Sequence, residues 1–183
     1  SDNGGLSVVE GNNTPATSNA PLREGKGWLY EGGIRVPFIV RGPAGLRKGE
    51  TADIPICGVD LTATLCELCG LTAPEQGDGV SFAGFLRGGA APASRPLYWH
   101  YPHYANQGGR PGGVVRDGRW KLIEFYEDQR RELFDLEKDP RENRNLSAEQ
   151  PQEVERLAKQ LDAWRTAIAA QSMTPNPAYR PHP

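Results

Sequence analysis

Two short segments of the sequence carry side chains that could bind a cation and an anion. Asp2 and Asn3 are adjacent oxygen donors, and the two glycines that follow them permit the sharp turn needed to aim both side chains at one point. Hard cations such as Ca²⁺ prefer these ligands, but calcium takes about six to eight oxygens, so the pair can supply only part of a site. The alternative is an Asn-Gly turn without a ligand role.

Lys26 stands between Gly25 and Gly27, which would let a ligand approach the backbone closely. Its ammonium is a compact positive charge that suits an oxyanion. The segment is not a phosphate-binding P-loop, because Gly27 replaces the Ser or Thr that should follow the lysine and Ala20 replaces the first glycine. Lys26 is therefore either an anion ligand or a solvated lysine on a mobile loop.

A further segment, residues 98–104, combines aromatic rings with His100 and His103. Their spacing across Pro102 excludes a helical metal pair, and a zinc site would need a third ligand that nothing nearby provides. The two imidazoles either pack among the aromatic rings with backbone partners or lie at the mouth of a polar pocket, where they would contact substrate. Arg110, in the glycine-rich stretch that follows, is a candidate substrate contact of the same kind.

Composition argues against several classes of function. Lys and Arg number 21 against 23 Asp and Glu, and the basic residues are scattered, so we expect no nucleic-acid partner. No apolar run approaches the roughly 20 residues that a bilayer span needs, and no charged-then-apolar leader opens the sequence. Cys66 and Cys69 have the C-x-x-C spacing, but without a second pair for zinc they are better interpreted as small core residues.

In the first half of the chain, a strand and a helix are expected. Residues 35–40 form a short apolar run that predicts a buried strand, although Pro37 favours an edge position. Asp60 can cap a helix that ends at Gly70. This helix has an apolar face that should pack on a sheet, formed by Leu61, Leu65 and Leu68.

In the second half, the dipeptide Asp117-Gly118 predicts a β-hairpin within an antiparallel meander. Ser147 and Gln150 fit a capping box at the start of a helix. The meander strands are expected at residues 96–101, 114–116, 119–126 and 132–136. The apolar face of the helix is expected to contain Val154, Leu157, Leu161, Trp164 and Ile168.

The order of these segments resembles a known family. Residues 1–5 and 21–37, then 95–103, 115–122 and 132–136, closely resemble the second half of the formylglycine-dependent sulfatases of the alkaline phosphatase superfamily. The resemblance implies an α/β fold in which residues 1–94 are the C-terminal part of an alkaline-phosphatase-like sulfatase domain. Residues 95–183 would be a small α+β C-terminal subdomain with an antiparallel sheet, a long helix and a Pro-rich tail.

The resemblance also implies roles for individual residues. Asp2 and Asn3 would be two ligands of the active-site Ca²⁺, with Mg²⁺ the second choice, and Lys26 would contact the sulfate. The substrate would be a sulfated carbohydrate or an aryl sulfate, read in part by His100, His103 and Arg110. Most such enzymes are exported, which implies a periplasmic or secreted location for the whole protein.

The nucleophile of these enzymes has no counterpart in the sequence. Formylglycine is made from Cys or Ser in the motif Cys/Ser-x-Pro-x-Arg, and none of Cys57, Cys66 and Cys69 begins it. The first residue is Ser1 rather than Met, so we expect a fragment, and because the nucleophile motif is missing we expect it to be inactive alone. Two alternatives are a phosphonate or phosphate ester hydrolase of the same superfamily and a non-catalytic, stand-alone remnant.

Overall fold

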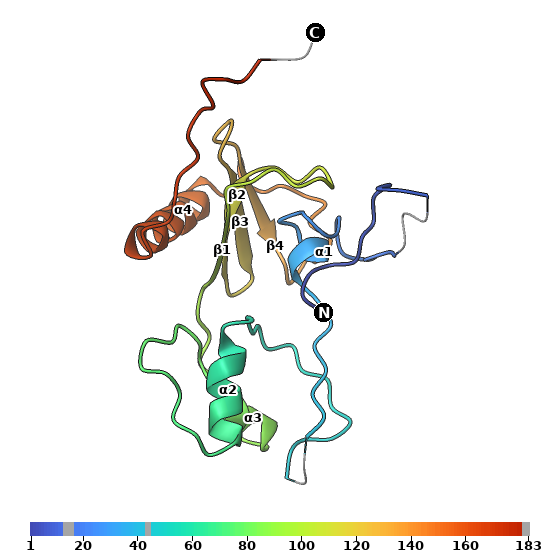
Figure 1. The fold of residues 1–183 in the computed structure, drawn as a ribbon, viewed down its shortest axis with the longest axis vertical. Coiled ribbons are helices and arrows are strands. Elements are labelled where there is room, and N and C mark those ends of the chain that lie inside the picture. Colours follow the sequence, from blue (N-terminus) through green and yellow to red (C-terminus); the bar gives the residue numbers. More distant parts are fainter. Residues whose placement is uncertain (13–16, 43–44, 181–183) are drawn as a thin grey trace. The chain divides into compact units, whose positions relative to one another are not determined.

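A four-stranded antiparallel sheet forms the centre of the larger part of the protein (Figure 1). The computed structural model describes residues 1–12, 17–42 and 45–180. The hairpin between the second and third strands turns at Gly118, whose φ of 59° suits glycine. The predicted meander and its Asp-Gly turn are therefore confirmed. Its strands are β1 (Leu97–Tyr101), β2 (Gly112–Asp117), β3 (Trp120–Phe125) and β4 (Arg131–Asp135), adjacent in chain order.

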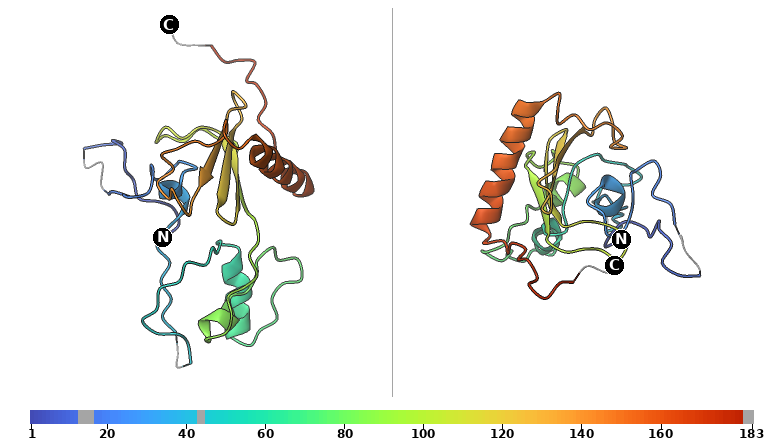
Figure 2. Two further views of the ribbon diagram at one scale, coloured as in Figure 1. Left: turned by 180° about the vertical axis from the view of Figure 1, so that it is seen from behind. Right: turned by 90° about the horizontal axis from the view of Figure 1, so that it is seen from above.

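One face of the sheet is covered by α4 (Pro151–Ala167) (Figure 2). Side chains alternate between the two faces along each strand, so Leu122 and Leu133 point toward α4 and meet Leu157 and Leu161 of the helix. All four are fully buried, and each such leucine contributes about 1.5–3 kcal/mol relative to an exposed position. The predicted helix and its apolar face are confirmed.

The start of α4 differs from the predicted capping box. Gln150 is the N-cap residue, no side chain caps the helix, and Pro151 occupies the first turn. The Ser147 backbone N–H instead donates to Asn145 Oδ1 at 2.9 Å. Proline at this position has no N–H to leave unsatisfied, so one of the groups that a cap would serve is absent.

The opposite face of the sheet packs against the N-terminal segment, which ends in the single turn α1 (Glu31–Ile34) (Figure 2). Leu29 and Tyr30 enter a second core together with Val114, Ile123 and Phe134. The chain divides after Phe38 and after Arg95 into two units, residues 1–38 with 96–183 and residues 39–95. In this division residues 1–38 lie with the sheet of the C-terminal region, and the expected division into residues 1–94 and 95–183 stays a prediction.

The smaller unit contains α2 (Asp60–Leu68) and α3 (Ala83–Leu86). The predicted helix and its end near Gly70, where φ is 69°, are confirmed. The predicted buried face is wrong, because Leu65 is 59% exposed while Asp60 and Thr64 are buried. A polar arrangement explains this orientation: the Asp60 carboxylate accepts hydrogen bonds from the backbone N–H groups of Cys57 and Val80, both at 2.8 Å, and from Arg95.

The strand predicted at residues 35–40 does not form. Ile39 is 89% exposed, and Pro37 has no N–H to donate to a neighbouring strand. Within the described residues the strands all belong to the β1–β4 sheet, so this apolar run has no strand to pair with. None of the helices in the same residues is both long and apolar enough to cross a membrane.

A buried ionic cluster ties α1 to the sheet. Lys121 Nζ on β3 lies 3.0 Å from Glu31 Oε1 and 2.8 Å from Glu142 Oε1, and these side chains are at most 2% exposed. The Glu31 backbone N–H donates to Glu142 Oε2 at 2.6 Å. Within the described part of the chain, Glu31 Oε2 accepts no hydrogen bond, and Glu142 Oε1 meets Lys121 as an ion pair without hydrogen-bond geometry. Two carboxylates thus share one ammonium.

Burial raises the pKa of the Glu142 carboxyl above its ordinary value of 4.5, and the negative charge of Glu31 adds to this effect. The attraction of Lys121 opposes the increase but is smaller. Arg23 closes the cluster on one side, because its guanidinium lies 3.8 Å from the centroid of the Tyr30 ring and donates to the Glu142 carbonyl oxygen at 3.0 Å.

Replacing Lys121 by Met should lower the free energy of unfolding by about 3–5 kcal/mol, because it leaves two buried carboxylates without their counter-charge. Urea unfolding of the chain, followed by tryptophan fluorescence, measures this. Adding Glu31→Gln and Glu142→Gln to Lys121→Met should recover part of the loss. The exposed Lys138→Met is the matched control, with a change expected within about 0.5 kcal/mol. A Lys121→Met variant as stable as that control would contradict the assigned role.

The raised pKa of Glu142 predicts a pH dependence of stability. Between the ordinary pKa of 4.5 and the higher pKa in the fold, the folded state binds more protons than the unfolded state. The contribution of this carboxyl to stability is therefore full below pH 4.5 and declines as pH rises through the folded pKa. Glu142→Gln, which keeps an acceptor for the Glu31 N–H, should remove this decline.

The measurement is the unfolding free energy of wild type and Glu142→Gln at several pH values from 4.5 upward. The wild type should lose stability relative to the variant as pH rises. The exposed Glu137→Gln should leave the wild-type profile unchanged. Parallel profiles for wild type and Glu142→Gln would show that Glu142 keeps its ordinary pKa.

Candidate functional site

An open pocket of about 410 Å³ lies in the larger unit, between the N-terminal segment and the first strand of the sheet. Three residues singled out in the sequence line it together: Asp2, Asn3 and Lys26. On the side of the sheet it is lined by Trp99 and Tyr101 of β1 and by His100 between them. The pocket therefore combines charged groups with aromatic groups.

The turn after Asp2 and Asn3 is fixed by close backbone packing. The Gly4 N–H donates to the Gly33 carbonyl oxygen at 2.8 Å, and a Cβ atom on Gly4 would lie 1.8 Å from the Gly32 oxygen. Only glycine fits there. The Asn3 amide donates through Nδ2 to Asp2 Oδ2 at 2.9 Å, so the other oxygens of the two side chains are without hydrogen bonds to the described residues.

Lys26 is held by its backbone and presents its side chain to solvent. Its N–H donates to the Gly5 carbonyl oxygen at 3.1 Å, and Gly27 adopts a φ of 87°. Lys26 is exposed, and its ammonium makes no ion pair or hydrogen bond with the residues that the structure describes. An exposed ammonium without a counter-charge in a pocket is available to an anionic ligand.

Asn19 joins the two loops, and the sequence did not single it out. Its amide Nδ2 donates to the carbonyl oxygens of Gly5 at 2.8 Å and Glu24 at 3.0 Å. Its Oδ1 accepts from the Gly5 N–H at 2.8 Å. The segment that follows Asp2 and Asn3 and the segment that precedes Lys26 are thus held together by one half-buried side chain.

The connection between β1 and β2 packs against the Lys26 loop. Trp28 Nε1 donates to the Gln107 carbonyl oxygen at 3.0 Å. A Cβ atom on Gly109 would lie 1.7 Å from the Gly27 oxygen, so the two backbones are in direct contact. Gln107 also lines the pocket. Neither Trp28 nor Gln107 stood out in the sequence, because this contact spans 79 positions along the chain.

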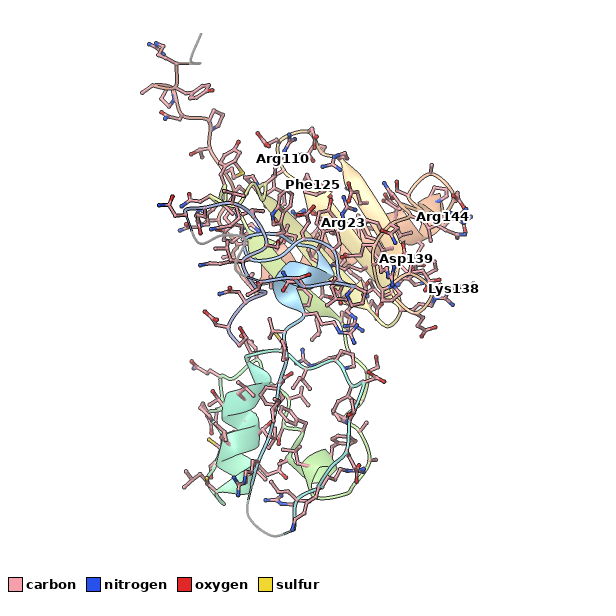
Figure 3. The ribbon with its side chains drawn as sticks, turned by 90° about the vertical axis from the view of Figure 1, so that its right-hand side faces the viewer. Arg23, Arg110, Phe125, Lys138, Asp139 and Arg144 are labelled. Atoms are coloured by element: carbon pink, nitrogen blue, oxygen red, sulfur yellow. The ribbon has the colours of Figure 1, made fainter. Side chains whose placement is uncertain are left out.

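Three further residues were predicted to contact substrate, and only one of them lines the pocket. His100 lines the pocket, but its Nδ1 lies 2.6 Å from the Tyr126 hydroxyl and its Nε2 lies 2.9 Å from the Gln171 carbonyl oxygen, so both ring nitrogens have partners. His103 is exposed and meets the ring of Tyr101 edge-on, with centroids 5.4 Å apart. Arg110 is exposed and lies just before β2, near the end of the sheet at which β2 begins and β3 ends with Phe125 (Figure 3). Neither His103 nor Arg110 is among the described residues that line the pocket.

The oxygen donors of the pocket suit a hard cation but do not complete its coordination. Asp2 offers a carboxylate with no basic partner among the described residues, and Asn3 offers an amide oxygen beside it. In the same residues there is no group of three or more His, Cys, Asp and Glu side chains placed to hold a metal. Because Ca²⁺ takes about six to eight oxygens, these two residues can provide a minority of its ligands.

Comparison with known proteins places this chain in a family. Residues 25–168 match the family described as N-sulphoglucosamine sulphohydrolase, C-terminal. A sulfatase of Formosa agariphila is 32% identical over 181 residues, which cover 90% of this chain and 32% of that protein. A Delta 4,5-hexuronate-2-O-sulfatase of Bacteroides thetaiotaomicron is 35% identical over 125 residues, or 65% of this chain and 25% of that protein.

The fold shows the same relationship. The crystal structure of a putative sulfatase from Bacteroides thetaiotaomicron superposes with a TM-score of 0.64 at 27% identity, over 80% of this chain and 34% of that one. The chain thus spans between 25% and 32% of the length of the two curated relatives. It belongs to the C-terminal N-sulphoglucosamine sulphohydrolase family and corresponds to the C-terminal portion of a sulfatase.

Proposed function

We propose that this chain provides the cation-binding and sulfate-binding side of a site that hydrolyses sulfate esters. The observation that carries the proposal is the exposed ammonium of Lys26, which has no partner among the described residues and lines the same pocket as Asp2 and Asn3. The family supports the reaction class, because the matched relatives are sulfatases.

The chemistry requires positive charge near the sulfuryl oxygens. As the nucleophile attacks sulfur, negative charge concentrates on the oxygens that surround it, and preorganised cations lower the energy of that state. A bound Ca²⁺ would polarise those oxygens as a Lewis acid. Asp2 and Asn3 would hold the cation, and Lys26 would bind a sulfate oxygen. The fixed backbone around Gly4 and Gly27 supplies the preorganisation.

The nucleophile is proposed to come from residues outside this chain. The formylglycine motif does not occur in the sequence, so we propose that the chain alone is inactive and acts together with the rest of a sulfatase. The substrate is proposed to be a sulfated carbohydrate, in line with the hexuronate sulfatase among its relatives. An exported location for the whole enzyme is proposed on the same family relationship.

Lys26→Ala should lower kcat/KM for a sulfate ester by about 10²–10³ in the complete product of the gene, because it removes one charge that stabilises the transition state. Lys138→Ala, an exposed lysine away from the pocket lining, should change the rate by less than about twofold. Steady-state kinetics with 4-nitrophenyl sulfate measure the effect. Equal rates for the two variants would overturn the role of Lys26. If the wild type turned over 4-nitrophenyl phenylphosphonate faster than 4-nitrophenyl sulfate, this would favour a phosphonate ester hydrolase.

Chelation with EGTA should abolish turnover by the complete gene product, and added Ca²⁺ should restore it. Asp2→Ala should require a higher Ca²⁺ concentration for half-maximal activity, because the cation loses a carboxylate ligand. Asp53→Ala, an exposed aspartate in the smaller unit, should show the wild-type requirement. Activity that survives exhaustive chelation would argue against a Ca²⁺ role for Asp2 and Asn3.

A further inference from the structure

The first strand of the sheet presents two different faces. Tyr98 stacks on Trp164 of α4, with centroids 4.9 Å apart and planes at 7°, and His100 binds Tyr126. Because side chains alternate along a strand, Trp99 and Tyr101 point the other way. Both line the pocket that contains Lys26. The strand β1 is at the edge of the sheet, so its Tyr101 end is not covered by another strand.

Trp99 is a rigid wall of the pocket. It packs against the core cluster that contains Leu29, Val114 and Phe125, and it remains partly exposed. Tyr101 continues the wall outward with 38% of its surface exposed, and its ring is supported by the edge contact with His103. An aromatic surface that the core already holds loses little conformational freedom when a ligand binds.

Among the residues that the structure describes, the polar atoms of these two rings have no hydrogen-bond partners. In the described part of the chain, neither Trp99 Nε1 nor the Tyr101 hydroxyl makes a hydrogen bond, whereas nearby Trp28 donates to Gln107 and nearby Tyr104 donates to Glu127 at 2.6 Å. A ring with an apolar face and a free N–H or O–H suits a ligand that is apolar on its faces and rich in hydroxyls at its edge. A pyranose ring has this character, while a simple aryl ring has only the faces.

We propose that Trp99 and Tyr101 form the subsite for the sugar ring that bears the sulfate ester. This rests on the proposed function, because the sulfate is then held at Lys26 in the same pocket. The ring lies against the two aromatic side chains, and its hydroxyls accept from Trp99 Nε1 and exchange hydrogen bonds with the Tyr101 hydroxyl. These two residues, rather than His103 and Arg110, then distinguish a sulfated sugar from other sulfate esters.

The test uses conservative variants of the complete gene product. Trp99→Phe and Tyr101→Phe keep an aromatic face but remove the N–H and the O–H. With the monosulfated hexosamine or hexuronate that the wild type hydrolyses fastest, each should raise KM about five- to tenfold with kcat nearly unchanged. With 4-nitrophenyl sulfate, which has no hydroxyls, both should keep the wild-type KM. Tyr104→Phe is the matched control and should behave as wild type on both substrates.

Tyr101→Ala extends the test, because it removes the aromatic face as well as the hydroxyl. It should raise the KM for the sulfated sugar further than Tyr101→Phe does. An unchanged sugar KM in Trp99→Phe and Tyr101→Ala, with wild-type turnover of both substrates intact, overturns the subsite and leaves the proposed function standing.

A binding measurement separates the remaining outcomes. Titration with the same sulfated sugars should quench tryptophan fluorescence in the wild type, and Trp99→Phe should abolish most of the quenching. Should the wild type hydrolyse neither ester, quenching that depends on Trp99 would support the subsite while overturning the proposed function. No hydrolysis and no quenching would overturn both.

Discussion

The ion pair between Lys121 and the two glutamates is the contact on which the geometry of the site depends. Asp2, Asn3 and Lys26, which line the charged side of the pocket, precede Glu31 in the chain. Glu31 in turn contacts Lys121 on β3, 90 positions away, and Glu142, 111 positions away. Burying three ionisable groups is costly, and apolar replacements of such clusters often stabilise a protein. If the N-terminal segment moved by one residue along the sheet, an apolar contact could re-form, but the buried charges would lose their partners. We therefore assign the cluster the role of fixing the register of the N-terminal segment on the sheet.

From that fixed point, the site is built mainly by backbone packing. Gly4 contacts α1, Gly109 contacts Gly27, and the Asn19 side chain hydrogen-bonds to both loops. The side chains of Asp2, Asn3 and Lys26 take almost no part in holding the fold, so their charges remain available to ligands. This division explains how an exposed lysine on a loop can still be well placed: its backbone N–H is bound to the Gly5 carbonyl oxygen, while its ammonium has no partner among the described residues and is available to an anion.

The sequence predicted elements whose signals are local. The β2–β3 hairpin follows from Asp117-Gly118, and α4 follows from the spacing of its leucines, because both depend on neighbours a few residues away. Features that depend on distant partners were missed. Lys121 alternates with apolar residues and looks like a solvent-facing position, yet it is completely buried because two glutamates from other segments meet it. The apolar run at residues 35–40 and the leucines of α2 were predicted to be buried, but several of these side chains are exposed. An apolar pattern indicates burial, but it does not identify the surface that would cover it.

For the site, the likeness to sulfatases grouped Asp2, Asn3 and Lys26, but the contact of Trp28 with Gln107 had no signal in the sequence.

The side chains of β1 meet two separate requirements, because some hold the strand in the fold and others line the pocket. Tyr98 stacks on Trp164 of α4, and His100, which also lines the pocket, is held through its ring nitrogens by Tyr126 and Gln171. Trp99 and Tyr101 face the pocket. A substitution at Tyr101 changes a surface that is 38% exposed and disturbs little of the core. The charged groups, in contrast, lie on the N-terminal segment, which the sheet holds through the core around Leu29 and Tyr30 and through Lys121. In the proposed function, recognition of the ring and stabilisation of charge at sulfur would therefore be carried by different segments of the chain. Within β1, the alternation of side chains lets one edge strand both pack on α4 through Tyr98 and line the pocket through Trp99 and Tyr101.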